Sequence, residues 1–193
     1  MNPPHPSGRT IALEGIGPVL FVKSRRARSI RITVRASQGV RVVVPIGVSF
    51  ADAERFAASR SPWIRRTLRR IEHARTRCRD AVLAAECLDS RQARSILATR
   101  LAELAEEHGL PYKRLSVRKQ RTLWGSASTA GRIQLNAFLA VLPQDLSDYV
   151  VLHELVHTRV NGHGRAFWRE LERRLDDVPR RRSLLREYSL ALF

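Results

Sequence analysis

Residues 145–160 constrain the fold most, because apolar residues and histidines recur there at spacings of three and four. The members of this stripe are Leu146, Tyr149, Val150, His153, His157 and Val160. Such spacing predicts a helix that begins near Asp145 and turns one face toward the protein interior. His153 and His157 then lie one turn apart on the buried face. Unpaired buried polar groups are costly, so these two imidazoles need partners, and one metal ion would serve both.

A second stripe predicts a third ligand. The apolar residues of the next helix recur at helical spacing, and they are Phe167, Leu171, Leu175 and Val178. His163 stands four residues before Phe167 and continues this stripe, while Asn161-Gly162 breaks the chain between the two helices. We therefore expect His163 to approach His153 and His157 from the second helix. Three protein ligands leave one tetrahedral position open, which is typical of catalytic zinc sites.

Glu154 follows the first histidine and lies about 100° around the helix from it, beside the metal and not among its ligands. A general base must occupy this position to take a proton from an activated water. We therefore expect Zn²⁺ as the cofactor and Glu154 as the catalytic residue. The metzincin pattern is excluded, because it needs a glycine where this chain has Val160, and a Met-turn, whereas Met1 is the only methionine.

The net charge of +17 comes from 35 basic and 18 acidic residues, and only three of the basic residues are lysines. Residues 1–72 are the more basic part, with 14 basic and 4 acidic side chains. Arginine binds phosphate groups bidentately, so this surface suits a nucleic acid or a nucleotide. A solvated surface on an arginine-rich chain explains the composition equally well, and both interpretations stay open.

The remaining features predict a cytoplasmic protein with no membrane partner. No apolar stretch reaches the roughly 18 residues that a membrane-spanning helix needs. The first eight residues do not resemble a secretory signal. Cys78 and Cys87 form neither a disulfide framework nor a metal-binding pair, and they are expected to be free thiols in a reducing compartment.

The patterns along the chain predict an α+β fold in three parts. Residues 1–19 are expected to form a tail and a first strand, residues 20–72 a strand-rich basic part, and residues 73–193 the catalytic domain. The elements expected within them are a hairpin of strands at 30–34 and 40–44, a helix that Ser49 caps, a short helix from Pro62, helices within 73–108, and strands at 115–117 and 133–135.

Four stretches of the chain resemble the YgjP-like metallopeptidase domain family, which is related to SprT-like zinc proteases. They are residues 23–48, Pro62-Trp63-Ile64, Trp124-Gly125-Ser126 with Ile133-Gln134-Leu135-Asn136, and residues 149–157 with 162–168. The resemblance implies a zincin-like fold with a small strand-rich N-terminal part. It also implies zinc on His153, His157 and His163, with Glu154 as the base. The family usually has a cysteine where this chain has Ala127, which is not among these ligands.

Asn136 has two interpretations, a turn residue that ends its strand or a substrate-binding residue on a strand edge where a peptide pairs. The leading functional hypothesis is hydrolysis of peptide bonds in a protein or peptide substrate. One alternative is a metal-dependent nucleotide pyrophosphohydrolase that acts on nucleoside triphosphates, although no phosphate-binding loop of the GxxxxGK[ST] type is present. A nucleic-acid-associated protease or binding module is the other alternative.

Overall fold

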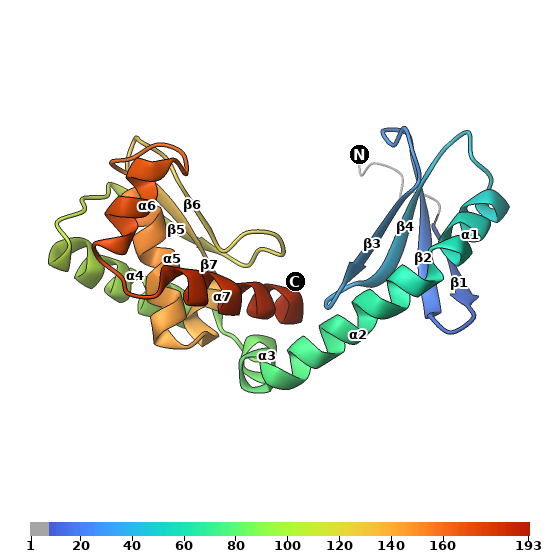
Figure 1. The fold of residues 1–193 in the computed structure, drawn as a ribbon, viewed down its shortest axis with the longest axis horizontal. Coiled ribbons are helices and arrows are strands. Elements are labelled where there is room, and N and C mark those ends of the chain that lie inside the picture. The colour runs from blue at the N-terminus through green and yellow to red at the C-terminus, as the bar shows by residue number, and fades with distance from the viewer. Residues whose placement is uncertain (1–7) are drawn as a thin grey trace. The chain divides into compact units, whose positions relative to one another are not determined.

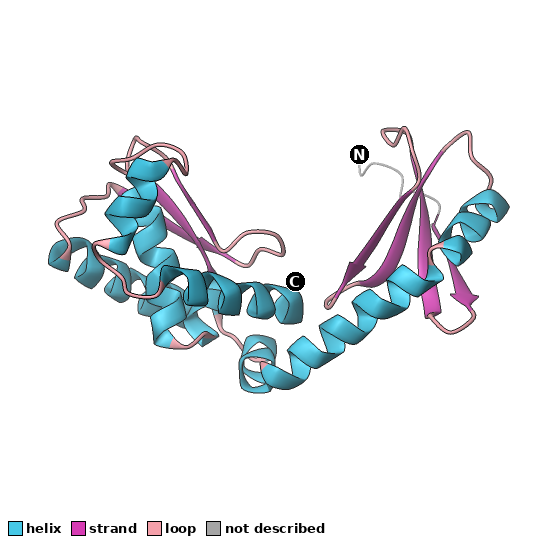
Figure 2. Cartoon of the chain, viewed as in Figure 1, coloured by secondary structure: helices cyan, strands magenta, loops and turns pink. Residues whose placement is uncertain are grey.

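The structure is a computed structural model that describes residues 8–193. The first seven residues of the predicted N-terminal tail lie outside the described residues. The chain divides into two compact units at the boundary between Arg77 and Cys78, and each unit contains both strands and helices (Figures 1 and 2). The predicted α+β fold class is confirmed.

The first unit is a four-stranded sheet with two helices. Its elements are β1 (Gly8–Leu13), β2 (Gly17–Ser24), β3 (Arg31–Arg35), β4 (Gly39–Pro45), α1 (Phe50–Ser59) and α2 (Ser61–Arg77). The strand order is β1-β2-β4-β3, with β2 and β4 parallel and the outer pairs antiparallel. The predicted hairpin of β3 and β4 is confirmed, and Gly39 supplies the left-handed φ of 66° at its turn.

Alternating side chains build the core of this unit. Val40, Val42 and Val44 of β4 are buried and pack with Val19 and Phe21 of the neighbouring strand. The predicted cap of α1 is confirmed, since the Ser49 hydroxyl accepts a hydrogen bond from the Asp52 amide at 3.0 Å. Two predictions were incomplete. Strand β2 was not predicted, and the helix that contains Pro62 is longer than the short helix predicted there. It continues for 17 residues, because Ile64, Ile71 and Ala74 keep one face buried and no further proline interrupts it.

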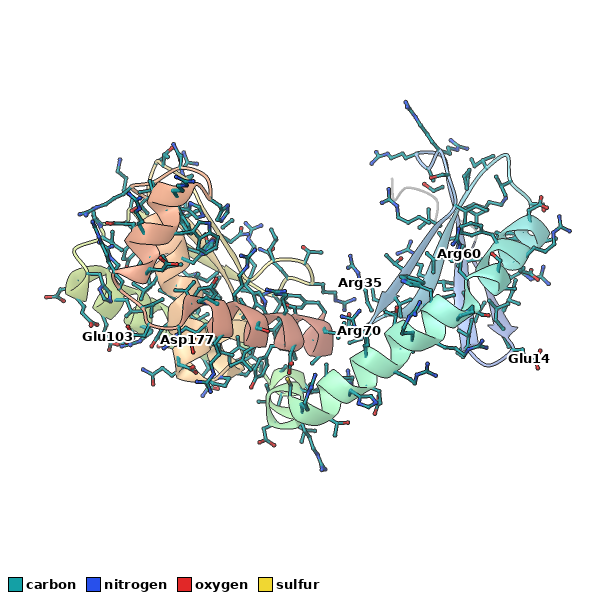
Figure 3. The ribbon with its side chains drawn as sticks, in the orientation of Figure 1. Glu14, Arg35, Arg60, Arg70, Glu103 and Asp177 are labelled. Carbon is teal, nitrogen blue, oxygen red and sulfur yellow. The ribbon has the colours of Figure 1, made fainter. Side chains whose placement is uncertain are left out.

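At least one basic residue of this unit, Lys23, has a structural role. The Lys23 ammonium donates hydrogen bonds to the carbonyls of Pro45 and Ile46, each at 3.4 Å, and to that of Val48. It also lies 4.9 Å from the ring centroid of Phe50. Other basic side chains are exposed to solvent, such as Arg70 on α2 (Figure 3).

The second unit places a three-stranded sheet among helices. Its elements are α3 (Arg79–Glu86), α4 (Ser90–Glu107), β5 (Arg114–Arg118), β6 (Gly125–Ala127), β7 (Arg132–Asn136), the 3₁₀ helix η1 (Ala137–Val141), α5 (Gln144–Val156), α6 (Arg165–Glu172) and α7 (Val178–Leu192). The strand order is β5-β7-β6, with β5 parallel and β6 antiparallel to the central strand. β6 was not predicted, because three residues carry too little periodicity to indicate a strand.

Helix α5 is the central element of this unit. It contacts α4, α6, α7, β6 and β7, and most of its side chains are buried. The partly buried ion pair between Arg100 of α4 and Asp148 of α5 is bidentate, with N–O distances of 2.7 and 2.9 Å. Contacts on several sides therefore hold the predicted metal-binding helix in place.

Two further expectations concern the cysteines and the membrane. Cys78 is buried and Cys87 is exposed, and neither forms a disulfide with another described residue. Within residues 8–193, none of the helices has the length and apolar character needed to span a bilayer.

Candidate metal centre

The first two histidines lie at the end of α5 and are half-buried. The predicted helix was too long, because α5 ends at Val156 and His157 is the residue that caps it, with φ −64° and ψ −17°. Val160 lies in the turn that follows. Its carbonyl oxygen is 3.1 Å from Nδ1 of His157, so an Nδ1–H can donate to it and leave the lone pair of Nε2 available to a metal.

His163 reaches the site from a loop. The prediction that it belongs to the second helix was wrong, because α6 begins at Arg165 and Gly164 is its N-cap. Gly162 has a φ of 70°, a left-handed conformation that interrupts any helical run through this position. The loop folds back over the end of α5 and brings the His163 ring to within 5.0 Å of the His153 ring and 4.7 Å of the His157 ring, measured between centroids.

The Nε2 atoms of the three histidines converge on one point. Nε2 of His163 lies 3.0 Å from that of His153 and 3.1 Å from that of His157. Ligand nitrogens around a tetrahedral zinc ion are about 3.3 Å apart, given Zn–N bonds of about 2.0–2.1 Å. Burial lowers the pKa of His153 to about 3, with the neighbouring histidines as a further cause. The His153 ring is therefore neutral at pH 7, the form that binds a metal, and the three converging nitrogens are a donor set that fits a divalent cation.

Two aromatic side chains of α6, Phe167 and Trp168, support this cluster. The Phe167 ring is fully buried and stacks on His157 at a centroid distance of 4.4 Å. It also meets the other two histidine rings edge-on, at 4.7 and 4.9 Å. Trp168 donates its indole N–H to the carbonyl of His163 at 2.9 Å. The ligand on the loop is thus tied to a helix by its own backbone.

Glu154 is buried, with 6% of its surface exposed. Its side chain turns toward β6, where the backbone of Gly125 lies against it. A methyl group on Gly125 would lie 2.7 Å from Cγ and 2.8 Å from Oε1 of Glu154, closer than side chains tolerate. Burial raises the pKa of Glu154 to about 7. A carboxyl group with such a pKa can exchange a proton near neutral pH.

Two residues that the sequence did not single out for the site also lie here. Tyr149 is buried one turn before His153, with ring centroids 6.1 Å apart. Arg182 of α7 places its guanidinium 5.2 Å from the ring centroid of Trp168. Burial raises the pKa of Tyr149, and the charge of Arg182 opposes this rise. No local motif marks Arg182, because only the packing of α7 brings it to the histidines.

Asn136 is buried in the middle of the sheet. β7 is the middle strand, so both of its edges are paired. The Asn136 side chain is 1% exposed. Its amide nitrogen donates to the carbonyls of Gln120 and Leu123, at 2.9 and 2.7 Å, and its oxygen accepts from the amide of Phe138 at 3.2 Å. These contacts favour the structural interpretation, in which Asn136 ties the loop before β6 to the start of η1, over the substrate-binding one.

Two solved structures are similar to part of this chain, and one family profile matches its sequence. The chain is similar to the crystal structure of the metallopeptidase zymogen jannalysin of Methanocaldococcus jannaschii, with 17% identity and a TM-score of 0.43 over 48% of this chain and 95% of the other. It is also similar to that of the metallopeptidase zymogen abylysin of Pyrococcus abyssi, with 22% identity and a TM-score of 0.39 over 46% and 87% of the two chains. No curated protein sequence matches.

The family profile described as "YgjP-like, metallopeptidase domain" matches residues 28–88 and 83–188. These matches include the whole histidine cluster, Glu154 and Gly125. A metallopeptidase family implies a divalent metal as cofactor, in agreement with the donor set described above. The resemblance predicted from the sequence is confirmed, and the chain belongs to the YgjP-like metallopeptidase domain family.

Proposed function

We propose that this protein is a zinc-dependent peptidase in which His153, His157 and His163 bind the metal and Glu154 is the general base. The main observation behind the proposal is that three imidazole nitrogens converge at the end of α5, the helix that also holds the buried carboxyl group of Glu154. A zinc ion on three histidines retains an open position, and it would lower the pKa of a water molecule and polarise a peptide carbonyl.

Glu154 would perform the proton transfers. It takes a proton from the attacking water and passes it to the amine that leaves when the peptide bond breaks. Burial keeps its pKa near neutrality, so the carboxylate can accept the proton and the acid can give it up again. Gly125 leaves the side chain room to adopt the observed position against β6.

Arg182 is the residue that we propose for charge stabilisation. The water attack places negative charge on the carbonyl oxygen, and a fixed donor near that oxygen lowers the barrier. Contact with Trp168 holds the guanidinium on the side of the histidine cluster. Its positive charge contributes, after burial and the neighbouring histidines, to the lowered pKa of His153. Tyr188 of the same helix lies instead where burial, followed by Cys78 and Asp145, raises its pKa.

Strand β6 is the edge that we propose for substrate binding. It pairs with β7 on one side only, and Gly125 at its start adjoins Glu154. An extended peptide can add to such an edge through main-chain hydrogen bonds, which would bring a peptide bond beside the base. This arrangement favours peptide bonds over the phosphoanhydride bonds of the alternative hypothesis.

The test compares the wild type with Glu154→Gln, each purified with one equivalent of zinc. We expect the wild type to cleave a fluorescently labelled unstructured protein. Glu154→Gln should retain the zinc and lose turnover, whereas the matched control Glu172→Gln, on the exposed face of α6, should keep both. Unchanged turnover in Glu154→Gln would show the proposal to be wrong. A parallel assay with nucleoside triphosphates distinguishes peptide hydrolysis from nucleotide hydrolysis. Cleavage of the triphosphates without cleavage of the protein would favour the pyrophosphohydrolase.

A further inference from the structure

Residues 108–144 contain six basic residues and no acidic residue. At the average acidic content of the chain, roughly three acidic residues would be expected in a segment of this length. An arginine-rich composition alone does not explain their absence. This segment contains the whole three-stranded sheet of the second unit.

The strands direct part of this charge to one face of the sheet. On β5, Leu115 and Val117 are partly buried, and Arg114 and Arg118 alternate with them and are exposed. On β7, the exposed Arg132 alternates in the same way with buried residues. The helices α4 and α5 contact this sheet, and the buried residues face them. The opposite face, which we call the arginine face, carries Arg114, Arg118 and Arg132.

An open hollow of about 680 Å³ lies on the arginine face. Hydroxyl and amide groups line it between the three guanidinium groups, and they belong to Ser116, Ser126, Ser128, Thr129 and Gln134. Among the residues that the structure describes, no acidic and no aromatic side chain lines it. The hollow therefore presents hydrogen-bond donors and positive charge without a base-stacking surface.

The described part of the chain supplies no acidic partner for the three arginines of this face. Arg114 and Arg132 are direct neighbours across the parallel pair of strands, an arrangement that is unfavourable for like charges. Among residues 8–193, no acidic side chain forms an ion pair with either of them or with Arg118. An anion bound in the hollow would relieve this repulsion, and phosphate suits guanidinium and hydroxyl donors.

We propose that the arginine face binds the phosphate backbone of a nucleic acid without reading its sequence. Arg114 and Arg118 are four residues apart on β5, which corresponds to about 13 Å along the strand. That length covers several successive phosphates of a backbone. A single nucleotide would require a more enclosed cradle, such as a glycine-rich loop, which the chain lacks. The absence of aromatic side chains from the hollow favours backbone contacts over base stacking.

The face and the metal centre lie on opposite sides of β6. Gly125 lies against Glu154 of α5, whereas Ser126, the next residue of β6, lines the hollow. Binding to the arginine face therefore requires neither the zinc nor Glu154. The inference does not depend on the proposed peptidase activity and can be tested separately from it.

The test measures binding of fluorescein-labelled 20-nucleotide single strands of two unrelated sequences by anisotropy, from 50 to 200 mM NaCl. The variant carries Arg114→Gln, Arg118→Gln and Arg132→Gln. The control carries Arg79→Gln, Arg91→Gln and Arg94→Gln, which remove the same charge from exposed arginines elsewhere in the unit. We expect the variant to bind at least 10-fold more weakly. We also expect the slope of log K, the association constant, against log [NaCl] to be smaller in magnitude by about 2 for the variant. Each phosphate contact contributes about 0.7 to this slope, and three arginines are removed.

Three outcomes would overturn the proposal: no binding by the wild type at 50 mM NaCl, equal losses in the variant and the control, or binding of ATP but not of oligonucleotides. Far-ultraviolet circular dichroism and thermal unfolding report whether the variant is folded. If it is not, the single substitution Arg118→Gln is the second test, and it should reduce the slope by about 0.7.

Discussion

The backbone of Gly125 lies directly against the carboxyl group of Glu154, so that a side chain at position 125 and the observed position of Glu154 exclude each other. A methyl group there would lie 2.8 Å from Oε1. We expect Gly125→Ala to displace Glu154 and to lower kcat by about 10- to 100-fold, because misplacement of a reacting group by about 1 Å has effects of this size. Zinc content should not change. Gly47→Ala is the matched control, since its new methyl group meets no neighbour within 4 Å; equal kcat values in the two variants would contradict the prediction.

Glu154 destabilises the metal-free protein above neutral pH. Its folded pKa, about 7, lies above that of the unfolded chain, so the folded state binds more protons between about pH 4.5 and 7 and stability falls as the pH rises through this window. In the presence of a chelator at pH 8, Glu154→Gln should therefore be more stable than the wild type by roughly 3 kcal/mol. Denaturant unfolding at pH 8 and at pH 4.5 tests this. The difference in the free energy of unfolding between the two proteins should disappear at pH 4.5. If the difference is the same at both pH values, the ionisation of Glu154 is not its cause.

Trp168 supports a metal ligand through the backbone, because its indole N–H donates to the carbonyl of His163. Trp168→Phe keeps an aromatic ring and removes this hydrogen bond. We expect zinc affinity to fall about 10-fold, a typical loss when a supporting partner of a ligand is removed. Competition with a chromophoric chelator measures it. Trp63→Phe, at an exposed tryptophan of the first unit, should bind zinc like the wild type. Equal affinity in all three proteins would mean that the loop holds His163 without Trp168.

Arg182 should affect the chemical step more than metal or substrate binding. We expect Arg182→Gln to lower kcat by about 100-fold, the size of effect typical of an oxyanion donor, with unchanged zinc content and a smaller change in KM. Arg182→Lys should recover part of the loss. Arg180→Gln, at an exposed position on the same helix, serves as the control. A rise in KM at constant kcat would instead assign Arg182 to substrate binding.

Asn136 should affect stability and not substrate affinity. Asn136→Ala removes the hydrogen bonds that the Asn136 side chain makes with the carbonyls of Gln120 and Leu123 and with the amide of Phe138. We expect a loss of about 2–4 kcal/mol in the free energy of unfolding, since each buried unsatisfied group costs on the order of 1–3 kcal/mol. Gln134→Ala, two residues earlier on β7 and partly exposed, should cost much less. An increase in KM without loss of stability would restore the substrate-binding interpretation.

Local periodicity made much of the fold predictable. The alternation in β4, the cap at Ser49 and the stripe of α5 each involve residues within a few positions of one another, and the backbone geometry of a helix or strand then determines which face they share. His153, His157 and Glu154 could be placed for this reason. The end of α5 could not, because apolar residues continue to Val160 although the helix ends at Val156.

The sequence alone determined the type of chemistry, through two histidines and a glutamate whose relative positions follow from one helical turn. Only the tertiary structure decided how that chemistry is assembled. His163 approaches from a loop, Gly125 limits the position of Glu154, Arg182 reaches Trp168 from α7, and Asn136 is enclosed in the middle of a sheet. These contacts join segments far apart in the chain, and they depend on how helices and strands pack together. Packing involves the shapes of many side chains at once, so no local pattern of residues encodes it.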